Sequence, residues 1–233
     1  MPTFEEIYAR HAAKYDALVS REDYQGNILP AIQRAIPLEG IDVVEFGAGT
    51  GRLTRMLVPF VKVIHAFDRS AHMLTIATER LQQAHKINWT LRVAENKSIP
   101  LPSASADLTI AGWSFGHVTE WHPTYWHEEI NTAVNEMKRL LRPGGTAVIL
   151  ETLGTASETP APPNAQLAAY YALLEQKYGF IRQAIRTDYQ FESLEEADKL
   201  VRFFFGNEMA DQVRKNNWVI VPEWTGVWSL RVD

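Results

Sequence analysis

Short apolar runs alternate with helix-like segments between residues 41 and 151, and this alternation restricts the possible folds more than any other feature of the chain. The predicted strands cover 41–46, 61–67, 87–94, 106–113 and 146–151, and the predicted helices 51–60, 70–85 and 127–141. Strands that alternate with helices favour a parallel sheet covered on both faces, with right-handed crossover connections. The chain is therefore predicted to adopt an α/β fold.

The segments that flank this alternation are predicted to add smaller elements. Upstream, apolar residues at helical spacing predict a helix over 4–19, and Pro30 is expected to open a second helix that stops before Pro37. Downstream, residues 152–164 are rich in Pro, Ser and Thr, which is typical of an exposed loop. Beyond the loop, the pattern predicts a helix over 165–178, a strand over 181–191, a helix capped by Ser193, a helix over 208–215 and two strand-like runs within 217–232.

The stretch VVEFGAGTGRLT, residues 43–54, lies where the first predicted strand passes into a helix. Its glycines alternate at Gly47, Gly49 and Gly51, and glycine permits positive φ angles and a close approach to the backbone. A helix N-terminus at such a turn offers free N–H groups, and in open parallel sheets the turn lies in the ligand-binding crevice. A tight turn without a ligand is the alternative, although it gives no reason for three flexible glycines. We therefore predict a nucleotide-type ligand at this turn.

Two classes of cofactor fit a glycine-rich turn of this kind. A dinucleotide fingerprint needs Gly or Ala at its sixth position, whereas that position is Arg52 counted from Gly47 and Thr54 counted from Gly49. Glu45, just before the turn, disfavours a pyrophosphate and favours a group with positive charge, such as an ammonium or a sulfonium. Asp68 ends the next predicted strand, about 20 residues on, where an acid can accept both ribose hydroxyls of either cofactor. Its alternative role is to cap the following helix.

Five motifs follow one another in a fixed order: VVEFGAGTGRLT, AFDRSAHML, AENKSIPLP, SADLTIAGW and LLRPGG. As a set, over roughly residues 41–151, they resemble the class I S-adenosylmethionine-dependent methyltransferases. Within that class they are most similar to the type 11 group, which includes the ubiquinone and menaquinone biosynthesis methyltransferases. The resemblance implies a methyltransferase of the EC 2.1.1 class that uses S-adenosyl-L-methionine.

The same resemblance implies a Rossmann-like, doubly wound fold. Its sheet is expected to have seven strands, mostly parallel, with an antiparallel strand at the edge formed by the Trp-rich last run. N-terminal helices and a C-terminal helical insertion complete the fold. We expect one methyltransferase domain over 1–233, with a helical cap over 1–37, and a loop and helix over 152–180 that form a possible substrate lid. The RPGG stretch, residues 142–145, is expected to be a tight turn before the fifth strand.

The resemblance also implies which residues bind the cofactor. It assigns Glu45, the glycine turn, Gly112 and Trp113 to the methionine end, and Asp68 to the ribose. The predicted cofactor-binding residues are Glu45, Gly47, Ala48, Gly49, Gly51, Asp68, Arg69, Met73, Glu95, Asn96, Gly112 and Trp113. Met73, Glu95 and Asn96 are assigned to the adenine, although Met73 also fits an ordinary helix core. The family commonly has Asp-Ala where this chain has Glu95-Asn96, so its adenine contacts depart from the usual pattern.

The stretch from Gly112 to His127 is dense in aromatic residues and histidines, as expected for an acceptor pocket over the cofactor. Within it, His117 is predicted as the catalytic residue, either as a general base or as a group that orients the acceptor. A purely structural histidine is the alternative. The other histidines and acids of the stretch lack the spacing of a metal motif, so no metal site is predicted. One tyrosine of the first helix, Tyr8 or Tyr15, is expected either at the pocket or in the core.

Composition narrows the choice of partners. The net charge of −5 argues against a nucleic-acid substrate, and the lack of cysteine excludes disulfides and thiolate metal sites. No run of residues reaches the apolar length of a membrane span or of a secretory signal. We therefore expect a cytoplasmic protein, a monomer or a homodimer, that methylates the oxygen, nitrogen or carbon of a small molecule. An NAD(P)-dependent oxidoreductase and a non-catalytic S-adenosylmethionine-binding protein are the alternatives.

Overall fold

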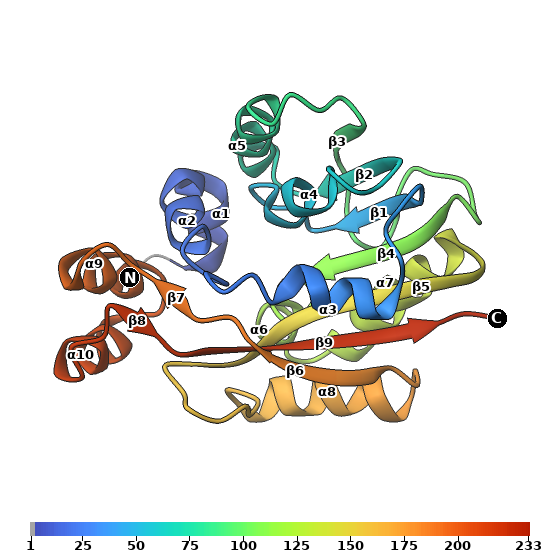
Figure 1. Ribbon diagram of the computed structural model, residues 1–233. Helices are drawn as coiled ribbons and strands as arrows, with labels where there is room; N and C mark the ends of the chain where they lie inside the picture. The colour runs from blue at the N-terminus through green and yellow to red at the C-terminus, as the bar shows by residue number, and fades with distance from the viewer. Residues whose placement is uncertain (1–2) are drawn as a thin grey trace.

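The structure, a computed structural model, describes residues 3–233 (Figure 1). Met1 and Pro2, which belong to the predicted cap, lie outside the described residues. The helices are α1 (Phe4–Arg10), α2 (Ala12–Val19), α3 (Ile28–Ala35), α4 (Arg52–Leu57), α5 (Ala71–Gln82), α6 (Val118–Trp121), α7 (Trp126–Leu140), α8 (Ala165–Gln176), α9 (Leu194–Phe204) and α10 (Asn207–Lys215). The strands are β1 (Asp42–Phe46), β2 (Val63–Asp68), β3 (Trp89–Val93), β4 (Ala106–Gly112), β5 (Leu141–Thr155), β6 (Ile181–Arg186), β7 (Tyr189–Gln190), β8 (Ile220–Val221) and β9 (Glu223–Arg231).

The central sheet has seven strands in the order β3-β2-β1-β4-β5-β9-β6. β1 pairs in parallel with β2 on one side and with β4 on the other, and parallel pairs extend the sheet to β3 and β5. The strand order therefore reverses between β1 and β4. In doubly wound sheets the crevice at the carboxyl ends of the strands on either side of such a reversal is where ligands bind. The predicted α/β, doubly wound fold is confirmed.

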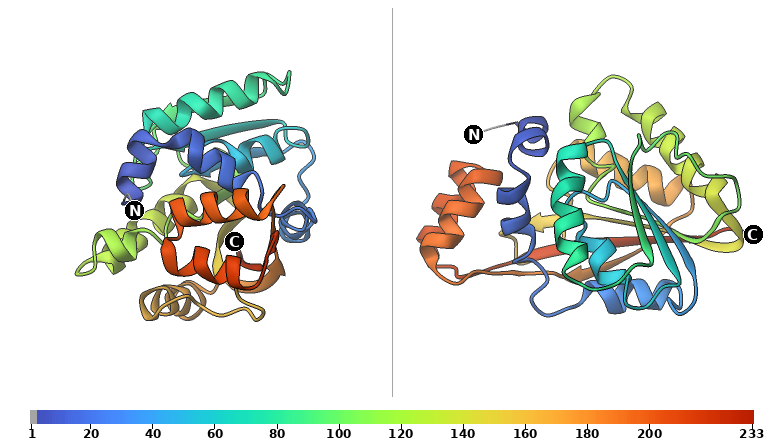
Figure 2. Two further views of the ribbon diagram at one scale, coloured as in Figure 1. Left: turned by 90° about the vertical axis from the view of Figure 1, so that its left-hand side faces the viewer. Right: turned by 90° about the horizontal axis from the view of Figure 1, so that it is seen from above.

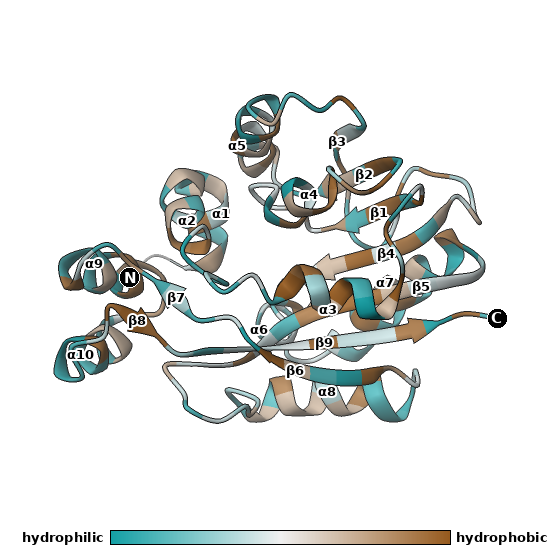
Figure 3. Ribbon diagram, viewed as in Figure 1, coloured by the Kyte–Doolittle hydropathy of each residue, from teal (hydrophilic) through white to brown (hydrophobic). Residues whose placement is uncertain are grey.

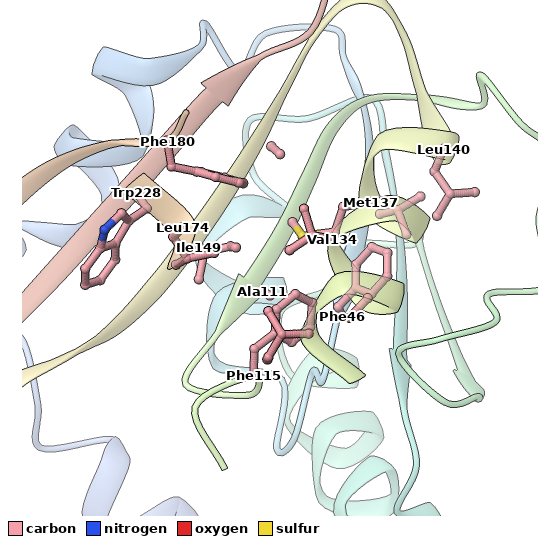
Figure 4. Packing of buried hydrophobic residues seen from close by; sticks show 14 of the residues in the cluster. Phe46, Ala111, Phe115, Val134, Met137, Leu140, Ile149, Leu174, Phe180 and Trp228 are labelled. Carbon is pink, nitrogen blue, oxygen red and sulfur yellow. The ribbon is translucent and has the colours of Figure 1, made fainter. Parts of the chain in front are cut away.

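Helices cover both faces of this sheet. Val43 of β1 belongs to a core shared with α3 and α4, whereas its neighbour Val44 belongs to a core shared with α7 and α8. This alternation follows from the two-residue period of a strand. Figure 4 shows part of the second core, in which Phe46 and Ile149 come from strands and Val134 comes from α7. In Figure 3 much of β1 and β2 is hydrophobic, whereas most of β6 is hydrophilic.

The antiparallel strand exists as predicted, but it lies one place inside the edge of the sheet. β9 pairs antiparallel with β5 on one side and with β6 on the other, so β6 forms the edge. Val227 and Trp228 explain this position, since these adjacent residues are buried in the cores on opposite faces of the sheet. β6 instead exposes its first four residues, as edge strands commonly do.

Two predicted helices differ from the structure, one in its middle and one at its start. The helix expected over 4–19 is interrupted at His11, whose φ of −128° and ψ of 29° are not helical, and it becomes α1 and α2. The second helix begins at Ile28 rather than at Pro30. Proline is tolerated there because the N–H groups of the first helical turn have no partner within the helix.

The RPGG stretch is part of β5 rather than a separate turn before it. β5 pairs with β4 first at Leu141 and again from Thr146 onward, and the register shifts between these two points. Gly144 has a φ of 80° within this irregularity. A glycine with positive φ inside a strand is typical of a β-bulge, so the two glycines bend a continuous strand. At its other end β5 runs on to Thr155, so the loop predicted from residue 152 begins later.

The C-terminal insertion forms a separate layer beyond the carboxyl ends of the strands. The strand predicted over 181–191 is divided into β6 and β7, and β7 pairs with β8 in a small second sheet. Together with α9 and α10 these strands enclose their own apolar cluster, which Leu18 of α2 completes. Figure 2 shows the N-terminal helices lying beside this insertion. The predicted cap of α9 is confirmed, since the Ser193 hydroxyl accepts the Glu196 N–H at 3.1 Å.

Candidate functional site

A cavity of about 720 Å³ lies at the carboxyl ends of β1, β2 and β4, next to the reversal of strand order. This volume falls within the range of roughly 300–1,000 Å³ that is usual for small-molecule sites. Its wall includes the turn after β1, the loops that follow β2, β3 and β4, and residues of α1, α6 and α7. The predicted site residues on this wall are Glu45, Gly47, Ala48, Gly49, Asp68, Arg69, Met73, Glu95, Asn96, Gly112, Trp113 and His117.

The glycine turn adopts the backbone conformation that its sequence predicts. Gly47, Gly49 and Gly51 have φ angles of 64°, 55° and 79°, a region that disfavours other residues. A Cβ atom at Gly47 would collide with the Ser114 hydroxyl, and one at Gly49 would lie 3.5 Å from the Met73 methyl carbon. Both glycines therefore keep this part of the cavity wall as bare backbone.

Gly51 is the one predicted cofactor-binding residue that is not on the cavity wall. It is the N-cap of α4, and a Cβ atom at this position would lie only 3.1 Å from the Cβ of Ala77 in α5. The third glycine is thus needed for the close packing of α4 on α5. The structure therefore gives Gly51 a packing role, and its predicted contact with the cofactor stays a prediction.

Asp68 joins the end of β2 to the glycine turn. Its Oδ2 accepts the Gly49 N–H at 2.8 Å, and its Oδ1 accepts the Ser70 N–H at 2.7 Å. Burial raises the pKa of this carboxyl, and the two hydrogen bonds oppose the rise. The N-cap of α5 is Ser70, whose hydroxyl accepts the Met73 N–H, so Asp68 does not cap the helix. The carboxylate is thus held at the cavity wall between two backbone segments.

Glu45 is buried at the end of β1, with only 2% of its surface exposed. Its Oε2 accepts a hydrogen bond from the Thr54 hydroxyl at 2.5 Å. Burial raises the pKa of Glu45 to about 8, the Thr54 hydrogen bond opposes this rise, and the nearby charge of Asp68 adds to it. A cation placed beside the carboxyl favours its ionised form and lowers this pKa.

The loop after β3 closes one side of the cavity. Asn96 donates from its Nδ2 to the Ser114 hydroxyl at 3.0 Å, which connects this loop to the one after β4. Glu95 precedes it on the cavity wall, and Met73 of α5 reaches the wall while only 2% of its surface is exposed. Arg69 is exposed, and its guanidinium carbon lies 5.4 Å from the Trp121 ring centroid. The residues predicted to contact the adenine therefore lie together.

His117 is partly buried and lies against the rings of Phe4, Tyr8 and Trp121. Its Nε2 shares a hydrogen bond of 2.7 Å with the Tyr8 hydroxyl, and its ring stacks on Trp121 with centroids 5.1 Å apart. Burial lowers the pKa of His117 to about 4, so the imidazole is neutral at pH 7. Of the two roles predicted for it, this environment favours orientation of an acceptor over proton abstraction, because a base with so low a pKa is weak at neutral pH.

The N-terminal helices cover the cavity. Tyr8 and Tyr15 both line it, although the sequence predicted only one of them there. The Ser70 hydroxyl donates to the Tyr8 carbonyl oxygen at 2.9 Å, which fixes α1 to the loop after β2. Residues of α1 and α2 therefore form part of the cavity wall, and a cap over 1–37 stays a prediction. The predicted lid over 152–180 lies elsewhere in part, since α8 buries Tyr170 and Tyr171 in the core below the sheet (Figure 1), and its role as a lid stays a prediction.

Two residues near the cavity had no sequence signal. Arg52 follows the glycine turn and lines the cavity, and its guanidinium carbon lies 4.4 Å from the Trp113 ring centroid. Glu151, at the end of the apolar part of β5, accepts the Gly116 N–H at 2.8 Å, and burial raises its pKa to about 8. Gly116, its hydrogen-bond partner, lies 35 residues earlier in the chain, so no local sequence pattern marked Glu151.

Over residues 3–233, no three His, Asp or Glu side chains are grouped as they must be to hold a metal ion. The same residues contain no helix with both the length and the apolar character needed to cross a bilayer. The absence of a metal and the cytoplasmic location stay predictions.

Residues 44–149 match the family model Methyltransf_11, which is described as a methyltransferase domain. An "uncharacterized methyltransferase" of Anoxybacillus flavithermus is 28% identical over 154 residues, which cover 64% of this chain and 67% of that protein. The YcgJ protein of Bacillus subtilis aligns with a TM-score of 0.62 and 12% identity over 89% of this chain and 99% of the other.

A fourth match is phosphoethanolamine N-methyltransferase 2 of Haemonchus contortus, solved with phosphomonomethylethanolamine and S-adenosylhomocysteine. It aligns with a TM-score of 0.63 and 16% identity, over 100% of this chain and 61% of that chain. At such identities the two solved structures show a shared fold alone. The finer resemblance to the ubiquinone and menaquinone enzymes is not confirmed by these matches.

Proposed function

Because the chain belongs to the class I S-adenosylmethionine-dependent methyltransferases, with its methyltransferase domain over residues 44–149, we propose that its acceptor is a small molecule bound under α1. The position of α1 over the cavity is the observation that supports this proposal. The Tyr8–His117 and Ser70–Tyr8 hydrogen bonds hold α1 over the cavity, and this arrangement favours a compact acceptor over a protein or a nucleic acid. Family membership decides against the NAD(P)-dependent oxidoreductase that the sequence left open.

The residues on the cavity wall fit the cofactor of this family. A Cβ atom at Gly49 would occupy space between Met73 and Tyr15, so the glycine leaves room for a ligand against the backbone. We assign Asp68 to the ribose hydroxyls, because it is a fixed, buried acceptor at the end of β2. We assign Glu45 and the turn of Gly47 to Gly49 to the methionine end, and Met73, Glu95 and Asn96 to the adenine.

When bound, S-adenosylmethionine supplies an electrophilic methyl group on a positively charged sulfonium. The contribution of the chain is then to position the acceptor and to exclude water. His117, neutral and fixed between Tyr8 and Trp121, is assigned to hold a polar group of the acceptor. The neighbouring aromatic rings of Tyr8, Tyr15 and Trp121, which meet edge to face at Tyr8, supply apolar contacts for the rest of the acceptor.

Thermal unfolding and a methyl-transfer screen test this proposal together. S-adenosylhomocysteine is expected to raise the midpoint of unfolding, whereas NAD at the same concentration is not. A methyl-labelled cofactor incubated with separate panels of amines, phenols, carboxylic acids and carbon acids is expected to label at least one small molecule. Stabilisation without any labelled product would instead support the non-catalytic alternative, and a failure of S-adenosylhomocysteine to stabilise the protein would contradict the assignment of the cavity.

A further inference from the structure

Glu151 occupies a position in β5 where the neighbouring side chains on the same face are apolar. Ile149, two residues before it, belongs to the core shared with α7 and α8 (Figure 4), and so does Leu153, two residues after it. Because side chains alternate along a strand, Glu151 points into the same core, and only 4% of its surface is exposed. Burying a carboxyl among apolar side chains costs free energy unless the carboxyl is hydrogen-bonded. The contacts of Glu151 must therefore account for its position.

The carboxyl of Glu151 contacts the loop that follows β4. Its Oε1 accepts the Gly116 N–H at 2.8 Å, and the Tyr170 hydroxyl of α8 lies 3.5 Å from the same oxygen. Burial raises the pKa of the carboxyl to about 8, and hydrogen bonds from the N–H groups of Gly116 and Phe115 oppose this rise. The acid thus supplies acceptors for two consecutive N–H groups of the loop.

These contacts begin just after the pairing of β4 with β5 ends. Gly112 is the last residue of β4 that pairs with β5, and the N–H that follows, that of Trp113, still reaches the Leu150 carbonyl oxygen at 2.7 Å. Farther along the loop, the buried N–H of Gly116 has no strand beside it. A buried N–H group needs a partner. The side chain of Glu151 supplies the acceptor that a neighbouring strand would otherwise provide.

Gly116 is the residue that lets the carboxyl come this close. Its φ angle does not lie in the positive region, so the backbone conformation itself does not require a glycine. A Cβ atom at this position would lie 2.9 Å from Glu151 Oε2 and 3.2 Å from a methyl carbon of Leu167 in α8. The space that a side chain would need is therefore taken by the carboxyl and by α8, and the glycine fits the acid.

We propose that Glu151 is a positioning residue of the methyltransferase, which fixes the turn over 115–117 and thereby the place of His117. His117 is also the N-cap of α6, and α6 carries Trp121, whose ring stacks on His117. A shift of the turn therefore changes how the imidazole meets Trp121 and the Tyr8 hydroxyl. The inference rests on the proposed function, which assigns His117 to the acceptor. Glu151 does not line the cavity, so it acts through the turn.

Glu151→Leu tests the proposal, because it keeps a side chain of similar size and removes both oxygens. In NMR spectra of histidine-labelled protein, the His117 ring signals, assigned with His117→Ala, are expected to shift in this variant. With an acceptor from the methyl-transfer screen, kcat/KM is expected to fall about 10- to 100-fold, as for a misplaced orienting group. The Kd of S-adenosylhomocysteine, from calorimetry, is expected to stay within about twofold of the wild type, because the cofactor does not contact Glu151.

Two further variants separate positioning from a general loss of stability. Glu151→Gln keeps an acceptor for the Gly116 N–H and is expected to retain the wild-type His117 signals. Glu136→Leu is the matched control, since Glu136 is also a buried acid and its Oε1 accepts a backbone N–H, that of Ile99, at 2.7 Å. Ile99 lies in the loop after β3, which carries no histidine. Glu136→Leu should therefore lower the free energy of unfolding and leave the His117 signals unchanged.

If Glu151→Leu does not fold, Gly116→Ala tests the same contact from the other side. Its Cβ pushes the turn away from the carboxyl, while Glu151 itself is kept. Because Gly116 does not line the cavity either, this variant is expected to shift the same His117 signals and to bind S-adenosylhomocysteine as the wild type does.

The proposal is overturned if the folded variant, Glu151→Leu or Gly116→Ala, keeps the wild-type His117 signals. It is also overturned if Glu136→Leu shifts these signals as much, because any loss of stability would then have the same effect. A loss of S-adenosylhomocysteine binding in Glu151→Leu contradicts it as well, since the acid would then support the whole cavity. A wild-type protein that does not bind S-adenosylhomocysteine contradicts the proposed function instead, and the His117 signals still decide whether Glu151 fixes the turn.

Discussion

Asp68 shows how one residue can support both the backbone and a ligand. Its carboxylate accepts N–H groups from the glycine turn and from the N-terminus of α5. We expect Asp68→Ala to weaken S-adenosylhomocysteine binding by about 1–3 kcal/mol, through the loss of charge-assisted hydrogen bonds. Calorimetry measures this loss, and Asp68→Asn, which retains one acceptor, should lose less. An unchanged affinity in Asp68→Ala would remove the residue from the site.

His117 gives a second test at the scale of a single residue. Burial lowers its pKa to about 4, below the 6.5 of a free imidazole, so the folded protein favours the neutral ring. The stability that this preference supplies is present above pH 6.5 and is lost as the pH falls toward 4. In NMR spectra of histidine-labelled protein, the His117 ring signals are therefore expected to stay constant from pH 8 to about 5.5. A titration midpoint near 6.5 would contradict the buried, neutral imidazole.

Cavity residues whose role depends on residues close to them in the chain could be predicted from the sequence. The spacing of Glu45, Gly47 and Gly49, and the place of Asp68 after the next strand, follow from the geometry of a strand, a turn and a helix, and all four residues line one cavity. Arg52 and Glu151 were not predictable as site residues, because their partners lie far along the chain. Glu22 precedes Arg52 by 30 residues, and Gly116 is separated from Glu151 by 35.

At the scale of elements, the packing of α4 on α5 depends on Gly51. Gly51 and Gly179 share a φ of 79°, but only a Cβ at Gly51 would meet another side chain, that of Ala77. Gly179→Ala therefore measures the backbone strain alone, about 1–2 kcal/mol. Gly51→Ala is expected to lose about 1–3 kcal/mol more, through overpacking. Urea unfolding measures both losses, and equal values would show that α5 moves away without cost.

The local sequence pattern predicts which segments form helices and strands better than it predicts the residues at which these elements end. The apolar pattern located β1, β2 and β4, because burial on both faces leaves a continuous apolar run. It missed the break at His11, which leaves the apolar spacing on both sides intact. The position of β9 inside the sheet depends on its pairing with β6. β6 is mostly exposed and has no continuous apolar run, so the sequence contains little indication of this pairing.

At the scale of the whole molecule, the sequence predicts one sheet and one cavity but not the charge inside it. Net charge counts every carboxyl as ionised, whereas Glu45 of β1, Glu151 of β5 and Glu223, the first residue of β9, are all buried. Burial is the main cause that raises the pKa of each to about 8. The protein is therefore less negative at pH 7 than its composition implies.

These three carboxyls predict how the stability of the whole protein depends on pH. Their pKa values of about 8 in the folded state exceed the ordinary value of 4.5, so the folded protein binds more protons than the unfolded chain between these limits. Their stabilising effect is complete below pH 4.5 and is lost as the pH rises through 8, with a slope of at most about 1.4 kcal/mol per pH unit for each proton. We therefore expect the free energy of unfolding, from urea titrations, to fall between pH 6.5 and 8.5. Glu151→Gln imitates the protonated acid and keeps an acceptor for the Gly116 N–H, so it should flatten this slope. A wild-type stability that rises over the same range would show that these acids are ionised in the folded protein.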